Sequence, residues 1–355
     1  MPDSISLSRL RLRFDSKENQ VSDELSAVAL TPEGNLWLGS DEGLGIERLS
    51  PTEADTFGHW RHFPLSPFFP FLDPKTEIDV EGLDYADGYL WVVGSHSTKR
   101  KKAKGNNETE DIARLTEIKA EPNRYLLARI PVANGELVES YQNAETSLTA
   151  AALQRTETSN ILIDALATDP HLGTIVRSGL PSKENGLDIE GLAVRGNRIF
   201  LGLRGPVLRG WAVILEIEAT TSATGVFTLA PLGTNGELYN KHFLELDGLG
   251  VRDLCWRGED LLVLAGPTME ADGALKVFQL RDIGRGLGST LSSQDSQRLK
   301  LLFNLPVVAG ADRAEGLTLY PGAEGTEALM VVYDSPHTTR KPNSGEVFAD
   351  VFQLT

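Results

Sequence analysis

The stretch NGLDIEGLAVRGNRIFLGLRGP, residues 185–206, contains the pattern that decides the fold. Two short apolar runs, GLAV and RIFLGL, flank the turn RGN, which is typical of a β-hairpin. The runs are nearly continuous, as expected for strands covered on both faces. The first run follows Asp188 and Glu190 and the second ends in Arg204, so charged residues stand at the open end of a buried hairpin.

Four other segments follow the same plan of an apolar run, a glycine-containing turn and a second apolar run. They are residues 26–40 (SAVALTPEGNLWLGS), 81–95 (EGLDYADGYLWVVGS), 253–266 (DLCWRGEDLLVLAG) and 315–335 (EGLTLYPGAEGTEALMVVYDS). Self-similarity of this kind along a chain indicates a repeat architecture.

A third strand-like segment follows each hairpin, and a fourth follows in the first four units: HWRHFPL, GELVESY, GVFTLAPL and RLKLLFNLP. The last unit runs out of chain, but ISLSRLRLRF, residues 5–14, alternates apolar and polar residues. This N-terminal strand would complete the last sheet and remove two sheet edges. We therefore expect an all-β fold, a β-propeller of five four-stranded blades with the last closed by the N-terminal strand. The uneven spacing of the repeats leaves room for a sixth, degenerate blade.

One propeller domain is expected over residues 1–355, with helical insertions between the second and third repeats, which stand further apart than the others. The insertions fall at about residues 97–122 and 144–178. The first contains the basic run KRKKAK, expected to be a solvated loop tip, and the second has apolar residues at helical spacing.

An acidic residue stands at the start of four of the first strands, which lie innermost in a propeller. These residues are Glu81, Glu190, Asp253 and Glu315. We expect these four residues to cluster around one mouth of the central channel. Two carboxylates about 6 Å apart would repel each other there by roughly 3 kcal/mol at an effective dielectric near 20. Such a ring needs a cation, paired arginines or protonation. Carboxylate oxygens alone suit Ca²⁺, or Mg²⁺ if several waters remain.

A structural explanation of this ring stands beside the metal site. Arg252 and Arg313 adjoin the acidic positions and would neutralise them. Repeated residues in a repeat protein also often perform repeated structural work. The residues alone leave open a structural ring, a metal site, or both.

The second strands end at the same mouth because hairpin strands are antiparallel. Two of these exits resemble each other, SHSTKRKK at residues 95–102 and SPHTTRKP at residues 335–342, and each contains Ser, His, Thr and basic residues in short succession. We therefore expect a basic rim around the acidic centre on this face. They supply His96 and His337 as candidate catalytic acid–base groups. Candidate groups for the anionic part of a substrate are Lys183, Arg204 and Arg209.

The bulk composition narrows the function classes. The net charge of −16 argues against nucleic acid or an anionic membrane as partner. Cys255 is the one cysteine, so no disulfide within the chain can form. No P-loop, zincin or Cys-x-x-Cys motif occurs, and we expect no organic cofactor. Without an apolar run of signal-peptide or membrane-spanning length, the expected location is cytoplasmic.

Most of the chain resembles a bacterial family catalogued as domain of unknown function 3616. The resemblance rests on DVEGLDYADGYLWVVGSHSTKRKK and PSKENGLDIEGLAVRGNRIFLGLRGPVLRGWAVILEIE, and RDLCWRGEDLLVLAGPTM and AEGLTLYP fit the same pattern. It implies a propeller fold and a cytoplasmic bacterial protein, with no established activity. A looser similarity links the EGL strand start to phytase-like and lactonase-like propellers that hold calcium on the axis.

Two functions follow as hypotheses. The first is a metal-dependent hydrolase of phosphoesters or other esters, in which the ring carboxylates hold a metal that polarises the substrate or lowers the pKa of a bound water. The second is a non-catalytic scaffold that binds a small anionic ligand or a protein partner on the axial face.

Overall fold

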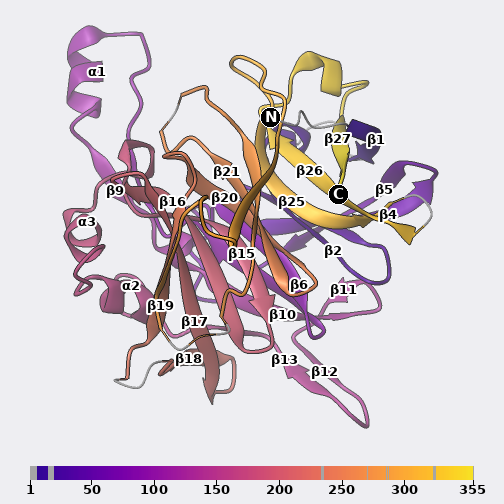
Figure 1. Ribbon diagram of the computed structural model, residues 1–355, viewed down its shortest axis with the longest axis horizontal. Helices are drawn as coiled ribbons and strands as arrows, with labels where there is room; N and C mark the ends of the chain where they lie inside the picture. The colour runs from indigo at the N-terminus through magenta and orange to yellow at the C-terminus, as the bar shows by residue number, and fades with distance from the viewer. Residues whose placement is uncertain are drawn as a thin grey trace.

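The computed structural model describes residues 6–14, 20–232, 236–269, 271–284, 286, 288–322 and 325–354. The fold is all-β, with curled sheets gathered around a common centre (Figure 1). Within the described ranges, no helix is both long and apolar enough to cross a lipid bilayer.

Antiparallel pairing of neighbouring strands builds the sheets. The first contains β2 (Leu25–Leu30), β3 (Leu36–Ser40), β4 (Gly45–Glu53) and β5 (Thr56–Pro64). The second contains β6 (Val80–Ala86), β7 (Tyr89–Gly94), β10 (Leu127–Ala133) and β14 (Ala151–Leu153). The third contains β15 (Asp188–Arg195), β16 (Arg198–Leu208), β17 (Trp211–Ala223), β18 (Val226–Ala230) and β19 (Tyr239–Glu245).

The remaining sheets follow the same plan. One contains β20 (Gly250–Arg257), β21 (Asp260–Gly266), β22 (Lys276–Leu280) and β24 (Leu299–Asn304). The other contains β25 (Arg313–Pro321), β26 (Glu327–Asp334), β27 (Glu346–Gln353) and β1 (Ser6–Arg13). As predicted, the N-terminal strand β1 pairs with β27, and it also lies parallel to β5, so the two ends of the chain meet in one sheet. Ile5, where that strand was expected to begin, lies outside the described residues.

The first strands of the sheets line the centre. β2, β6, β15, β20 and β25 lie side by side in that order, and β25 contacts β2 again. Glycine in the EGL repeat permits this approach. A Cβ on Gly82 would lie 2.7 Å from Leu192 Cβ, and one on Gly191 would lie 2.8 Å from Leu254 Cγ. The recurring glycine is therefore a packing requirement between neighbouring inner strands.

A β-bulge marks the start of each inner strand. The register with the second strand shifts at one unpaired residue in every case, namely Ser26, Glu81, Glu190, Arg252 and Glu315. Bulges commonly re-aim a side chain. In β20 the residue at this position is Arg252, whereas Asp253 pairs with Leu264 and corresponds to the glycine of the EGL repeat. The prediction that Asp253 belongs to the acidic ring was therefore wrong by one residue.

The two expected insertions contain less helix than the sequence predicted. Residues 97–122 include a two-stranded ribbon, β8 (Thr98–Arg100) and β9 (Ile118–Ala120), joined through α1 (Glu108–Arg114). Figure 1 shows α1 projecting from the body. Residues 144–178 include α2 (Ile161–Leu166) and α3 (Gly173–Ser178), but they begin with β13 (Ser147–Thr149) and β14. Burial of the alanine-rich β14 against its neighbours overrides its helical propensity.

Other segments that were expected to form strands also differ from the prediction. The GELVESY segment forms only β11 (Glu136–Leu137) at the end of β10 and part of β12 (Ser140–Gln142), while β14 is the fourth strand of the second sheet. In the third sheet, β18 pairs with the far half of β17, and β19 pairs with its near half. β23 (Thr290–Ser292) extends this sheet beyond β19. Short 3₁₀ segments complete the list: Gln20–Asp23, Pro122–Tyr125, Ser182–Glu184 and Thr338–Arg340.

Candidate functional site

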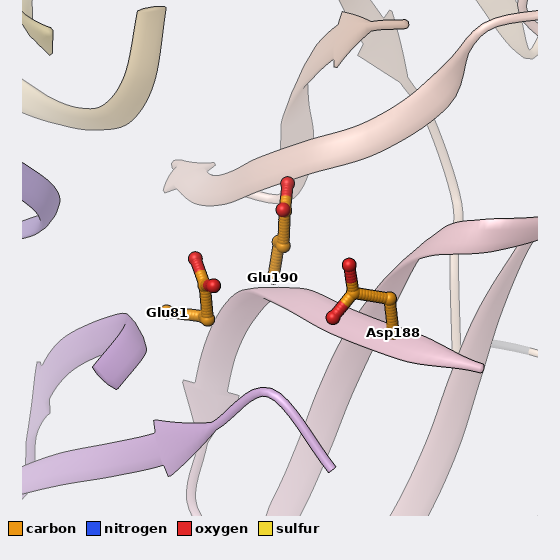
Figure 2. Close-up of side chains that lie close together, drawn as sticks. All are labelled: Glu81, Asp188 and Glu190. Carbon is orange, nitrogen blue, oxygen red and sulfur yellow. The ribbon is translucent and has the colours of Figure 1, made fainter. Parts of the chain in front are cut away.

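Three carboxylates from neighbouring inner strands meet at one mouth of the central channel. One oxygen each of Glu81 on β6 and of Asp188 and Glu190 on β15 lie within 4.8 Å of one another. Figure 2 shows the three side chains rising from the two strands into the same space. All three are buried. The bulges at Glu81 and Glu190 turn both side chains toward the axis instead of into the sheets.

Two arginines neutralise part of this cluster. Arg204 Nη1 lies 2.9 Å from Glu190 Oε1 and 3.6 Å from Asp188 Oδ2. Arg252 Nε lies 2.9 Å from Glu190 Oε2, and the same guanidinium also pairs with Glu315. Glu190 therefore has two cationic partners. Arg252 is one of the two arginines expected to neutralise the ring, whereas the other, Arg313, lies 3.6 Å from Asp334 instead.

Glu81 has no such compensation. It is 9% exposed and makes no hydrogen bond or ion pair within the described part of the chain. Burial, followed by the negative charges of Glu190 and Asp79, raises its pKa well above 4.5. Asp188 has a buried Oδ1 with no hydrogen-bond partner among the described residues, and burial with the charge of Glu190 raises its pKa strongly. The cluster thus retains carboxylate oxygens available to a ligand.

Further acids surround the cluster. Asp79 pairs with Arg124 at 2.5 Å, and burial raises its pKa despite that partner. Burial, with the charge of Asp79 next, raises the pKa of Asp41 to about 7. Burial likewise raises the pKa of Glu315 to about 8, although Arg252 opposes the shift. The pKa values of Asp41 and Glu315 therefore lie near neutral pH, because burial and neighbouring acids disfavour the ionised carboxylates.

Asp253, the remaining acid of the predicted ring, does not belong to this group of carboxylates. Its Oδ1 accepts from the backbone N–H of Leu254 at 2.8 Å, and its Oδ2 accepts from the N–H of Leu317 on the next inner strand at 2.7 Å. It is 1% exposed. Its carboxylate fastens β20 to β25, which is a structural role.

A cavity of about 790 Å³ opens above the carboxylates. Asp41, Asp79, Glu81 and Asp188 form its acidic floor. Glu184 and a few neutral residues also line the cavity. Its basic wall contains Lys99, Arg100, Lys101, Lys102, Arg114, Lys119, Arg124, Lys183 and Arg204. Six of these come from the ribbon-and-helix projection, residues 98–120. The first four residues of KRKKAK line the cavity, where the exit of the second hairpin was expected to contribute to a basic rim, whereas residues 102–104 are exposed, as in a solvated loop.

The charge of the projection contrasts with that of the whole chain. It contains seven lysines and arginines against four acids, a balance of +3 in a protein of net charge −16. Arg100 pairs with Glu184, with Nη2 2.8 Å from Oε2, and Thr98 Oγ1 donates to the carbonyl of Gly179 at 2.9 Å. These contacts fasten the base of the projection beside the cavity.

A smaller cavity of about 70 Å³ adjoins the large one and shares Lys183, Arg204, Met269 and Ala271 with it. Apolar side chains, among them Leu275 and Val308, contribute much of its lining. The combined space offers acidic, basic and apolar surfaces to one ligand.

The two histidines have structural contacts. His96 is 2% exposed, its Nδ1 lies 2.7 Å from the carbonyl of Gly94, and its Nε2 lies 2.8 Å from Asn160 Nδ2. Burial lowers its pKa to about 4, so it stays neutral and holds Asn160, the N-cap of α2. His337 caps a 3₁₀ turn by accepting from the N–H of Thr339. Neither histidine lines the cavity, so the expectation of catalytic histidines is corrected by their contacts.

The three candidate residues for binding an anionic group do not all lie at the cavities. Arg204 is buried in the cluster and Lys183 lines both cavities. Arg209 is exposed in the turn between β16 and β17 and lines neither cavity. Sequence reasoning did not single out Asp41 or Arg124, because both lie beyond the hairpin pattern and reach the mouth only through folding.

Comparisons with known proteins support a family assignment and no activity. No curated protein matches the chain. Among solved structures, virginiamycin B lyase from Staphylococcus aureus is 12% identical, covering 92% of this chain and 67% of that one, with a TM-score of 0.33. The aldose sugar dehydrogenase of Streptomyces coelicolor is 9% identical, covering 97% and 98%, with a TM-score of 0.38. A luciferin-regenerating enzyme is 7% identical, covering 98% and 96%, with a TM-score of 0.40.

These likenesses are distant, and the fold described above rests on the strand pairings of this chain alone. A family model described as "Protein of unknown function (DUF3616)" matches residues 24–350.

Proposed function

We propose, on the premise that the chain belongs to the family of proteins of unknown function DUF3616, that it is a five-bladed propeller that binds a divalent cation at its axial carboxylates and hydrolyses an anionic ester. Phosphoesters are the first class to test, because the cavity combines carboxylates with a basic wall. The observation that carries the proposal is Glu81, a buried carboxylate without a partner in the described chain, beside the unpaired Oδ1 of Asp188.

The charge balance favours a divalent ion. When ionised, Glu81, Asp188, Glu190 and Glu315 carry four negative charges, while Arg204 and Arg252 supply two positive ones. A cation of charge two would complete the balance. Oxygen ligands alone favour Ca²⁺, or Mg²⁺ with retained waters. Glu81 and Asp188, with Glu190 beside them, would hold it, and the bound ion would polarise the substrate or lower the pKa of a water.

The chain's own residues supply the other functions of a hydrolase. The lysines and arginines of the projection would hold the anionic group of the substrate through charge-assisted hydrogen bonds. Asp41 lines the cavity, and its pKa of about 7 suits a group that must both accept and donate a proton at neutral pH. We propose Asp41 for that role in place of His96 and His337.

The test uses the full chain freed of metal with EDTA. Calcium and magnesium titrations followed by calorimetry should give saturable binding in the wild type and a loss of at least tenfold in affinity in Glu81→Gln. Turnover of p-nitrophenyl phosphate, p-nitrophenyl acetate and lactones should require the ion and fall by 10²–10⁴-fold in Asp41→Asn. Glu145→Gln, a change on an exposed loop, is the matched control. Absence of both binding and turnover would reject the proposal.

A non-catalytic scaffold remains the second candidate. It is favoured by Arg252, which bridges Glu190 and Glu315 and thereby stabilises the ring without a metal. Ion binding without turnover, together with recovery of one stoichiometric protein or small anionic ligand on the axial face, would support this function over hydrolysis.

A further inference from the structure

Arg129 occupies an unusual position between two cavities far from the axial carboxylates. One cavity measures about 330 Å³ and the other about 270 Å³, and Arg129 and Thr221 line both. The site lies where β14 runs parallel to β18 and joins the second and third sheets. The lining residues come from β7, β10, β13, β14, β17 and β18 and from the turns beside them.

Aromatic rings hold the guanidinium in place. Arg129 Cζ lies 4.7 Å from the ring centre of Tyr89, 5.5 Å from that of Trp91 and 5.9 Å from that of Phe227. Such contacts stabilise the cation and restrict its orientation. A contact with a ring provides no hydrogen-bond acceptor in the plane of the guanidinium, where its N–H groups bind oxyanions.

The N–H groups of Arg129 are poorly satisfied. Its Nε is buried and has no hydrogen-bond partner among the described residues. Within the described ranges its side chain makes one hydrogen bond, a long one from Nη2 to Thr221 Oγ1 at 3.4 Å. No carboxylate of the described chain forms an ion pair with it, although the protein contains 50 acidic residues. A buried donor without an acceptor is unfavourable, and a bound anion would supply the missing acceptor.

The cavity linings favour an anion as well. Hydroxyl groups gather there, from Ser147, Thr149, Thr220, Thr221 and Thr224. Neither lining contains an aspartate or a glutamate. One oriented arginine among neutral hydroxyls and without acids is an arrangement that accepts a carboxylate or phosphate group and hydrogen-bonds to its remaining oxygens.

This site is separate from the axial cavity. Asn197, which also lines it, lies in the turn after β15, whereas Asp188 begins that strand at the axial mouth. Eight residues of extended strand place these ends about 23 Å apart. No residue of the axial cavity lines either of the two cavities at Arg129.

We propose that Arg129 and the surrounding hydroxyls form a second binding site, for the carboxylate or phosphate group of a small polar molecule. The site does not depend on the axial cation or on hydrolysis there. Its occupation would link the second and third sheets, because the ligand would contact side chains from both.

The experiment measures thermal midpoints of EDTA-treated protein against ligand concentration, at ionic strength matched with sodium chloride. Inorganic phosphate and acetate are the bare groups, and glucose 6-phosphate and glucuronate carry the same groups on a sugar. We expect a saturable rise in midpoint with at least one phosphate or carboxylate probe. A stronger response to the sugar-borne form would identify the hydroxyl-rich lining as a sugar contact.

The variants identify the site. Arg129→Met keeps an apolar chain against the rings and should weaken the response at least tenfold. Thr220→Asp places a carboxylate in the lining while keeping Arg129, and should weaken it similarly even if the first variant folds poorly. Arg155→Met removes another ring-stacked arginine, over Phe71, and should leave the response unchanged.

Two results would overturn the proposal. The first is the absence of a saturable response to all four probes. The second is an equal response in the wild type, Arg129→Met and Thr220→Asp, which would assign the anion to the axial basic wall.

Discussion

Glu81→Gln should stabilise the metal-free protein at pH 8 and abolish its response to calcium. Both effects follow from one feature, because Glu81 is a buried carboxylate with acidic neighbours and no cation of its own. Most substitutions of buried charged residues destabilise a protein, so a gain in the unfolding free energy would be informative.

The magnitude follows from the geometry. Oxygens of Glu81 and its two acidic neighbours lie within 4.8 Å, and at an effective dielectric near 20 each ionised pair repels by roughly 3–4 kcal/mol. Arg204 and Arg252 already offset the charge of Glu190, so about one pair is uncompensated. Burying the new amide costs about 1–2 kcal/mol. The expected net gain is therefore about 1–3 kcal/mol.

The gain in unfolding free energy of Glu81→Gln over the wild type should depend on pH, and the direction of that dependence follows from the pKa of Glu81. The pKa of Glu81 is raised in the folded state, so the contribution of this group is fully favourable below its ordinary value of 4.5 and is lost as pH rises through the raised value. Glutamine does not titrate. The difference between variant and wild type should therefore approach its minimum at pH 4 and grow toward pH 8.

Urea denaturation with EDTA at several pH values measures this difference, and the matched control is Glu190→Gln. That variant leaves Arg204 and Arg252 facing each other without their shared partner, which should cost about 3–5 kcal/mol. If Glu81→Gln loses as much stability as Glu190→Gln, or if calcium still raises its midpoint as in the wild type, the account of Glu81 as an uncompensated metal ligand is refuted.

Three further substitutions test the fold and the histidine. Gly191→Ala places a Cβ 2.8 Å from Leu254 Cγ and should cost about 1–3 kcal/mol in denaturation, whereas Gly286→Ala, with open space, should cost far less. His96→Leu should cost about 1–3 kcal/mol because it removes the Nε2 partner of the Asn160 amide group in a buried site, without changing the pH profile of any turnover. Arg100→Gln should speed limited proteolysis of residues 98–120 while leaving the global midpoint nearly unchanged, because its partner is partly exposed.

The repeat pattern of the sequence predicted much of the architecture. The paired apolar runs predicted the inner hairpins, and the alternation of residues 5–14 predicted a strand that pairs with the last one in the chain. These features are local, since strand period, turn residues and burial are written in short segments. Segments without that pattern were misjudged, as with β14, whose alanines became a strand through contacts distant in sequence.

For the site, spacing along the chain identified Glu81, Glu190 and Glu315 but misplaced Asp253. The error arises from the β-bulge at the start of β20, because the bulge decides which residue faces the axis. No local signal in RDLCW distinguishes Arg252 from Asp253 for that position. A basic rim was expected from the charged strand exits, but the sequence did not show that KRKKAK and the ribbon after it would line a cavity over the carboxylates.

The amino-acid sequence by itself determined the repeated hairpins, the glycines that let inner strands approach, and the presence of acids at strand starts. Only the tertiary structure decided which charges are partners. The distances between Glu81, Asp188, Glu190 and Arg252 arise from the packing of separate sheets around an axis, and a pKa depends on those distances and on burial.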